Sequence, residues 1–140
     1  GDLASAALSK NVKETLEELY LSDVNGFLPL FLNCNRLRSV AIPSGCDIGM
    51  LRQMGRESKS PLTSVMISAA GIGDLGLLAL APALKSTVEV TIPGADLTVT
   101  EIGLVEFVHA CPQLKHFSIS KNWAASLQPK VPSTVIVHLF

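Results

Sequence analysis

The chain has 140 residues, of which 48% are hydrophobic and only 16% are charged, so it is predicted to bury a sizeable core as a single domain over residues 1–140. A formal net charge of −1 argues against nucleic acid as a partner, because phosphate binding needs a basic surface. Three cysteines are too few for a disulfide scaffold, so we expect a protein of the cell interior, cytoplasmic or nuclear. No apolar run reaches the length of about 20 residues that a membrane span needs, so we expect no membrane binding.

The first predicted elements are a helix and a strand. Asp2 is placed to cap a helix over residues 2–10. Residues 18–22 then alternate Leu19 and Leu21 with polar or amphipathic side chains, which is the two-residue period of a half-buried strand. Pro29 is expected to interrupt the helix-like stretch that follows.

Three further helices are predicted along the chain. Asp47 is placed to cap residues 48–54, and Asp74 begins a helix over residues 75–84. Pro82 removes one backbone N–H, so that helix should kink or restart near Ala81. The segment 98–101 is typical of a capping box, in which a Thr oxygen accepts from the third backbone N–H and Glu101 reaches back, ahead of an apolar stretch over residues 102–108.

One spacing of apolar residues recurs along nearly the whole chain, with an apolar residue at a first position, three residues later and two residues later again. Successive copies begin 20 to 27 residues apart. Internal repeats of this period are typical of stacked strand-and-helix units. The copies are Leu16-Leu19-Leu21, Leu37-Val40-Ile42, Leu62-Val65-Ile67, Thr87-Val90-Ile92, Leu114-Phe117-Ile119 and Thr134-Val137-Leu139.

Extended to Asn122, the copy that begins at Leu114 resembles a leucine-rich repeat, and the resemblance covers about residues 3–140. A Cys three residues before the first leucine, at positions 34 and 111, is similar to the cysteine-containing subtype. Residues 72–81 resemble the helical segment of the ribonuclease-inhibitor subtype, and both subtypes are mainly intracellular. Only Asn122 fits the Asn position, so the other turns should satisfy their backbone groups in other ways. The departures are Val24, Gly45, Ala70 and Ala95.

The resemblance implies an α/β fold: a right-handed leucine-rich repeat solenoid of about five to six repeats, with a parallel sheet on the concave face and helices on the convex face. If equivalent positions of the repeats lie side by side, alternate side chains of each strand point to the concave face, where we expect a partner protein to bind. The expected binding residues are Glu18, Tyr20, Ser39, Ser64, Met66, Glu89, Thr91, His116, Ser118 and His138.

Other chemistry has less support. His116 and His138 are two imidazoles that are able to begin a metal site or a pH switch, with Glu89 as a third ligand, but His138 is expected to lie diagonally away, which favours separate surface histidines. No G-x-S-x-G turn is present, and the triad-like set of Glu89, His116 and Ser118 would lie on an open sheet face without oxyanion donors. We therefore predict no enzymatic activity, no metal and no cofactor.

The cysteines and His109 have simple structural interpretations. Cys34 and Cys111 are expected to be buried free thiols between helix and strand, and Cys46 to be the more accessible one. His109 is expected to be a packing or rim residue of an apolar helix.

The leading hypothesis is thus a non-enzymatic protein interaction module, with Tyr20 and Met66 as the main contacts and Glu18 and Glu89 favouring a basic partner. The alternative is a structural subunit or recognition arm of a larger assembly, of the ubiquitin-ligase adaptor or cytoskeletal kind, with contacts through the convex helices or the loops around Cys46 and Trp123. An uncapped last strand over residues 135–140 predicts self-association, or continuation in a longer parent chain.

Overall fold

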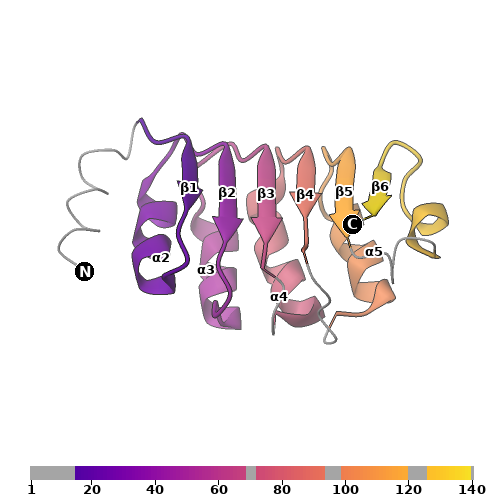
Figure 1. Ribbon diagram of the computed structural model, residues 1–140, viewed down its shortest axis with the longest axis horizontal. Helices are drawn as coiled ribbons and strands as arrows, with labels where there is room; N and C mark the ends of the chain where they lie inside the picture. The colour runs from indigo at the N-terminus through magenta and orange to yellow at the C-terminus, as the bar shows by residue number, and fades with distance from the viewer. Residues whose placement is uncertain (1–14, 69–71, 94–98, 120–125, 140) are drawn as a thin grey trace.

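Six parallel strands form one sheet, and their order in the sheet is their order in the sequence (Figure 1). The computed structural model describes residues 15–68, 72–93, 99–119 and 126–139. The predicted α/β class is confirmed, and each copy of the apolar spacing supplies one strand. The strands are β1 (Glu18–Tyr20), β2 (Ser39–Ile42), β3 (Ser64–Ile67), β4 (Glu89–Thr91), β5 (His116–Ile119) and β6 (Ile136–Leu139).

The helices connect successive strands and lie behind the sheet in Figure 1, so they cover one face of the sheet. No helix of the described residues lies over the other face, which is here called the open face. Within the described ranges there are four α-helices and two short 3-10 helices, and none is long and apolar enough to cross a membrane. They are α2 (Val24–Asn33), α3 (Ile48–Glu57), α4 (Gly73–Leu80), η1 (Ala81–Leu84), α5 (Glu101–His109) and η2 (Gln128–Lys130).

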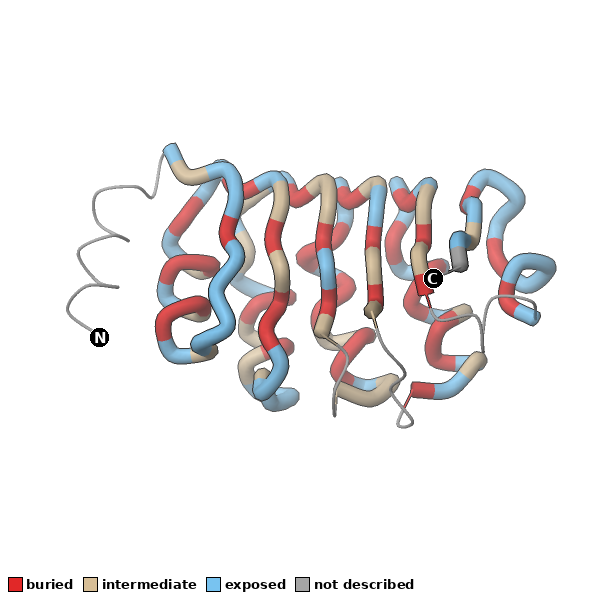
Figure 2. The backbone as a smooth tube through the Cα atoms, viewed as in Figure 1, coloured by how far each residue is buried: buried red, intermediate tan, exposed pale blue. Residues whose placement is uncertain are grey.

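The core lies between the covered face of the sheet and the helices. Figure 2 shows buried and more exposed residues alternating along the strands, as a period of two requires. The middle residues of the first five copies of the apolar spacing pair side by side across the sheet in the predicted register. They are all buried: Leu19, Val40, Val65, Val90 and Phe117.

The two ends of the repeat pattern differ from the prediction. β1 ends at Tyr20, so Leu21 lies beyond the strand and is 38% exposed instead of inward-facing. At the other end Thr134 is exposed and Val137 is only partly buried, whereas Val135 is buried. Within the described residues, β1 and β6 each pair with one strand only, and apolar positions with one neighbouring repeat are covered less completely. The predicted helix over residues 2–10, together with Ala70, Ala95, Asn122, Trp123 and Phe140, lies outside the described residues.

The helix starts confirm one predicted cap and correct another. Asp47 is the N-cap of α3, and its Oδ1 accepts the N–H of Met50 at 2.8 Å. The capping box at 98–101 is wrong, because the N-cap of α5 is Thr100, whose hydroxyl accepts the N–H of Gly103 at 3.1 Å. Glu101 forms an ion pair with Lys130 instead, which lowers the pKa of its carboxyl.

The two prolines behave differently. At Pro82 the α-helix gives way to 3-10 geometry, since α4 ends at Leu80 and η1 begins at Ala81, as predicted. Pro29 does not interrupt its helix, because α2 continues through it to Asn33. An internal proline costs a helix about 3 kcal/mol, but each fully buried Phe contributes about 1.5–3 kcal/mol, and Phe27 and Phe31 are both buried on this helix with their rings stacked.

Side-chain hydroxyls satisfy backbone groups at the turns that precede the strands, the opposite end of the repeat from the expected Asn. Ser60 Oγ accepts the N–H of Leu37 at 3.0 Å and donates to the carbonyl of Cys34 at 2.8 Å. Thr87, which replaces the first apolar residue of its copy, is fully buried and donates its hydroxyl to the carbonyl of Leu62 at 2.9 Å. A polar residue is tolerated at this core position because its hydrogen bond is made.

The outer edge of β6 is partly covered, contrary to the prediction of an uncapped strand. Gln128 Nε2 donates to the carbonyl of Val135 at 2.9 Å, and Gln128 Oε1 accepts the N–H of Val137 at 2.8 Å. The side-chain amide therefore occupies two backbone groups that another strand would otherwise use, which is one way in which proteins block edge pairing.

Candidate functional site

All ten residues predicted to bind a partner lie on the open face, in two columns that run across the strands. The register places them in neighbouring pairs from β1 to β6. Their position is confirmed, and their role in binding stays a prediction. The first column is Glu18, Ser39, Ser64, Glu89, His116 and Ile136, and the second column is Tyr20, Ala41, Met66, Thr91, Ser118 and His138.

Large apolar side chains are exposed at two places on this face. Tyr20 is 56% exposed and Met66 is 44% exposed, and both belong to the second column near its β1 end. The hydroxyl of Tyr20 is hydrogen-bonded to the hydroxyl of Ser39 on the next strand, which restrains the ring. Ile136 is the third exposed apolar side chain, at the β6 end of the first column.

A small pocket of about 280 Å³ adjoins Tyr20 where β1, β2 and β3 end. Its walls combine the Tyr20 ring with aliphatic side chains and several serine hydroxyls. Leu21 was not among the predicted site residues, because the alternation assigned it to the core. The carboxyl ends of parallel strands lie at one edge of the sheet. The residues that directly follow the predicted strands were therefore the sequence signal for a pocket at this edge. The lining residues are Tyr20, Leu21, Ser22, Ala41, Ile42, Pro43, Ser44 and Ser68.

His116 and His138 contact each other, contrary to the expected separation. They are diagonal neighbours, because His116 pairs with Ile136 and His138 pairs with Ser118. Nevertheless, His116 Nδ1 and His138 Nε2 lie 3.0 Å apart and the ring centroids lie 5.2 Å apart. Diagonal positions on adjacent strands are about 7–8 Å apart, which is still within reach of two aromatic side chains.

The charge of the open face is acidic. Glu18 and Glu89 are exposed members of the first column, and neither column contains a lysine or arginine. Three strand spacings separate the two carboxylates, a distance of about 14 Å between backbones. A bound basic side chain would therefore meet one glutamate or the other, not both.

All three cysteines are free thiols. Cys34 and Cys111 are buried, as predicted, and burial raises the pKa of both, that of Cys111 to about 12. Cys46 is half-buried and is the more accessible of the three. Burial, and then the charge of Asp47, raise the pKa of its thiol as well. His109 is exposed near the end of α5.

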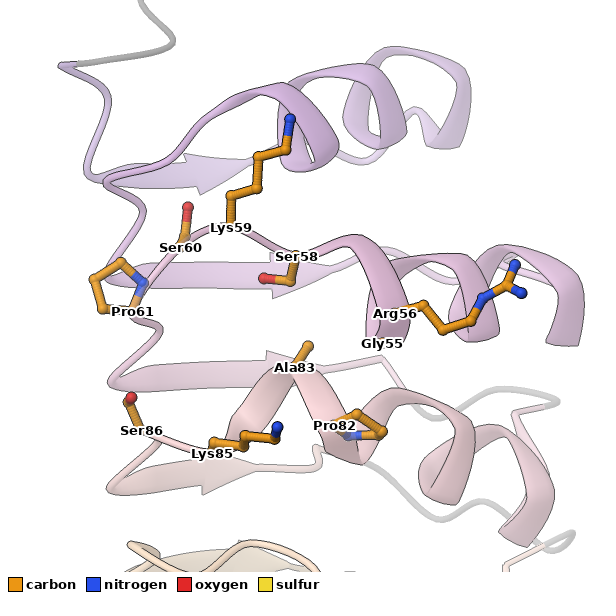
Figure 3. Close-up of a pocket in the computed structure, with 10 residues that line it drawn as sticks. All are labelled: Gly55, Arg56, Ser58, Lys59, Ser60, Pro61, Pro82, Ala83, Lys85 and Ser86. Atoms are coloured by element: carbon orange, nitrogen blue, oxygen red, sulfur yellow. The ribbon is translucent and has the colours of Figure 1, made fainter.

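A larger pocket, of about 580 Å³, lies at the opposite edge, where α3 and η1 end (Figure 3). Sequence reasoning did not find it. Arg56, Lys59 and Lys85 line it, but Figure 3 shows their charged ends at three separate places and not directed at a common point. The hydroxyl of Ser60 is already engaged by backbone groups. The pocket therefore lacks a converging set of donors for an anion.

Comparisons with known proteins give no identity. No protein-family model matches the chain, and no curated protein matches it at a significant level. The resemblance to leucine-rich repeats accordingly rests on the sequence pattern and not on a matched relative, and the open face of the sheet is the candidate site by its geometry.

Proposed function

We propose that the chain is a leucine-rich-repeat-like module, a right-handed solenoid with a concave open face, that binds a partner protein without catalysis. Two observations support the family assignment. The apolar spacing that defines the repeat coincides with the strands, and the strands follow one another across the sheet in sequence order. Two buried free thiols also suit a reducing compartment such as the cytoplasm.

The observation that carries the binding proposal is the uncovered face with Tyr20 and Met66 in one column beside the small pocket. Exposed aromatic and flexible apolar side chains dominate the energy of protein interfaces, while small polar side chains such as Ser64 mainly supply complementarity. The strands hold these side chains on a backbone fixed by ladder hydrogen bonds. Binding to a preorganised surface avoids much of the ordering cost that a flexible loop would incur.

The chemistry of the face indicates the kind of partner. An apolar side chain of the partner would fill the pocket next to Tyr20 and Leu21, and a lysine or arginine would lie over Glu18 or Glu89. The expected ligand is thus a protein segment that combines a large apolar residue with basic residues.

A second candidate, a subunit that contacts its assembly through the helix ends, is favoured by a different observation. Leu75 and Ile102 are each 72% exposed on the first turns of the adjacent helices α4 and α5, and Ile48, at the start of α3, is also exposed. In this second candidate, the three exposed aliphatic side chains on neighbouring helix starts are the contact edge.

Selection from a random peptide library, followed by mapping of the bound peptide by NMR, separates the two candidates. The amide shifts of β1, β2 and β3 should change most on addition of the selected peptide. Changes confined to the first turns of α4 and α5 would contradict the open-face proposal and support the second candidate.

A further inference from the structure

His116 and His138 form a pair of imidazoles at the surface of the open face. His138 is exposed and His116 is half-buried, and they come from the adjacent strands β5 and β6. The two facing nitrogens, His116 Nδ1 and His138 Nε2, are 3.0 Å apart. Two sheet strands therefore hold two metal-ligating atoms side by side, on a backbone that needs no rearrangement.

The separation suits two ligands of one metal ion. Imidazole nitrogens lie about 2.0–2.1 Å from a bound transition metal, so two of them are about 2.9–3.4 Å apart for angles between square and tetrahedral geometry. The observed 3.0 Å lies at the square end of that range. Neutral imidazoles are able to carry their protons on the outer nitrogens, which leaves both facing nitrogens with lone pairs. In the structure these two nitrogens form a hydrogen bond with each other, so chelation requires the two rings to rotate until both lone pairs converge on one point.

The surroundings define an open site. Glu89 precedes His116 in the first column, and Ser118 and Ile136 are the direct neighbours across the strand pair. Within the described residues, no three His, Cys, Asp or Glu side chains are arranged to hold an ion, so the pair would supply two ligands and water the others. Such a site binds reversibly and exchanges its metal.

We propose that His116 and His138 chelate a divalent transition-metal ion, with Cu²⁺ bound more tightly than Ni²⁺ or Zn²⁺. The order follows the general affinity series of first-row metals at nitrogen ligands. Metal binding requires neutral imidazoles, so acidification weakens it. The test of this proposal needs no partner protein, although His116 and His138 also belong to the proposed binding face.

The test is a titration of Cu²⁺ into the chain without a polyhistidine tag, followed by calorimetry and by electron paramagnetic resonance. All proteins in this test carry Cys46→Ser, because the half-buried thiol of Cys46 would otherwise compete with the histidines for Cu²⁺. One Cu²⁺ per chain with hyperfine coupling to two nitrogens is expected. His116→Ala and His138→Ala should each weaken binding by at least about tenfold, since even outer-shell partners of a metal ligand contribute about 10- to 100-fold.

His109→Ala is the matched control, because His109 is an exposed histidine on α5 and should leave Cu²⁺ binding unchanged. Circular dichroism with a chelator present checks that each variant is folded. Should an alanine variant unfold, His116→Gln and His138→Asn replace it, since they retain hydrogen bonding but ligate poorly. Unchanged affinity in the His116→Ala/His138→Ala double variant, or dependence on only one of the two histidines, would overturn the proposal.

Discussion

Asp74, on the first turn of α4, holds Thr100, the residue that caps the neighbouring helix α5. Its Oδ1 accepts the N–H of Thr100 at 2.8 Å and its Oδ2 accepts the Thr100 hydroxyl at 2.5 Å. Thr100 in turn accepts the N–H of Gly103 at the start of α5. One carboxylate therefore joins two successive helices at the edge where they begin.

Removal of this contact should destabilise the fold. Asp74→Ala is expected to lower the free energy of unfolding by about 1–2 kcal/mol, because it removes two charge-assisted hydrogen bonds and weakens the cap of α5. Gly103→Ala should also destabilise, because a Cβ there would lie 2.1 Å from the Asp74 carboxyl. Urea unfolding measures both effects.

The double variant is the sharper measurement. Asp74→Ala removes the group that an alanine at position 103 would meet. The double variant should therefore lose less unfolding free energy than the two single variants lose together. Asp23→Ala is the control, since Asp23 caps α2 through Asn25 and is not in contact with Gly103. Full additivity of Asp74→Ala and Gly103→Ala would show that the close approach does not exist.

The alternation of core and surface predicts two classes of substitution on one strand. Ile67→Ala should cost about 2–5 kcal/mol because the side chain is fully buried and leaves a cavity. Ser64→Ala, on the open face of the same strand β3, should cost less than about 0.5 kcal/mol. Chemical denaturation compares them, and a costlier change at Ser64 would mean that the register is shifted by one residue.

The features that the sequence predicted are periodic or local. The spacing placed Val40, Val65 and Val90 in the core in the correct register, and Asp47 and Pro82 marked a helix start and a helix end, since each acts on its nearest backbone groups. The missed contacts join residues that are far apart in sequence. These contacts depend on the direction of each side chain in the assembled sheet and helices, which the spacing of residues does not give. They are the contacts of Asp74 with Thr100, Gln128 with Val137, and His116 with His138.

Gln128 should limit edge-to-edge association of the sheet. Gln128→Ala frees the N–H of Val137 and the carbonyl of Val135, and exposed edge groups are a template for pairing with another chain. Sedimentation velocity over a range of concentrations should show more self-association than for the parent chain. Gln128→Glu keeps an oxygen that accepts from the N–H of Val137 but loses the N–H that donates to the carbonyl of Val135, so an intermediate degree of self-association is expected. An unchanged distribution of species in Gln128→Ala would contradict this role.

The buried thiols predict a loss of stability at alkaline pH. Burial raises the pKa of Cys111 from 9.0 to about 12, so as the pH rises the unfolded chain loses this proton first. The stability due to the neutral thiol is complete below pH 9.0 and is lost progressively up to about pH 12.

In this window the free energy of unfolding should fall by about 1.4 kcal/mol per pH unit from this group. Cys34 acts in the same direction, because burial raises the pKa of its thiol too. Urea unfolding of Cys111→Ala should therefore show a shallower decline than the parent chain, though not a flat one. Identical pH dependence of the two proteins would contradict the assignment.

The most direct test of partner recognition by the open face is the affinity of Tyr20→Ala for the peptide selected against the parent chain. The account predicts a loss of more than about 1 kcal/mol in binding free energy with little change in melting temperature, because the side chain is exposed. Lys85→Ala, in the pocket at the opposite edge, should bind like the parent. Binding that survives Tyr20→Ala combined with Glu89→Ala, but is lost in Leu75→Ala combined with Ile102→Ala, would contradict the account and place recognition at the helix starts.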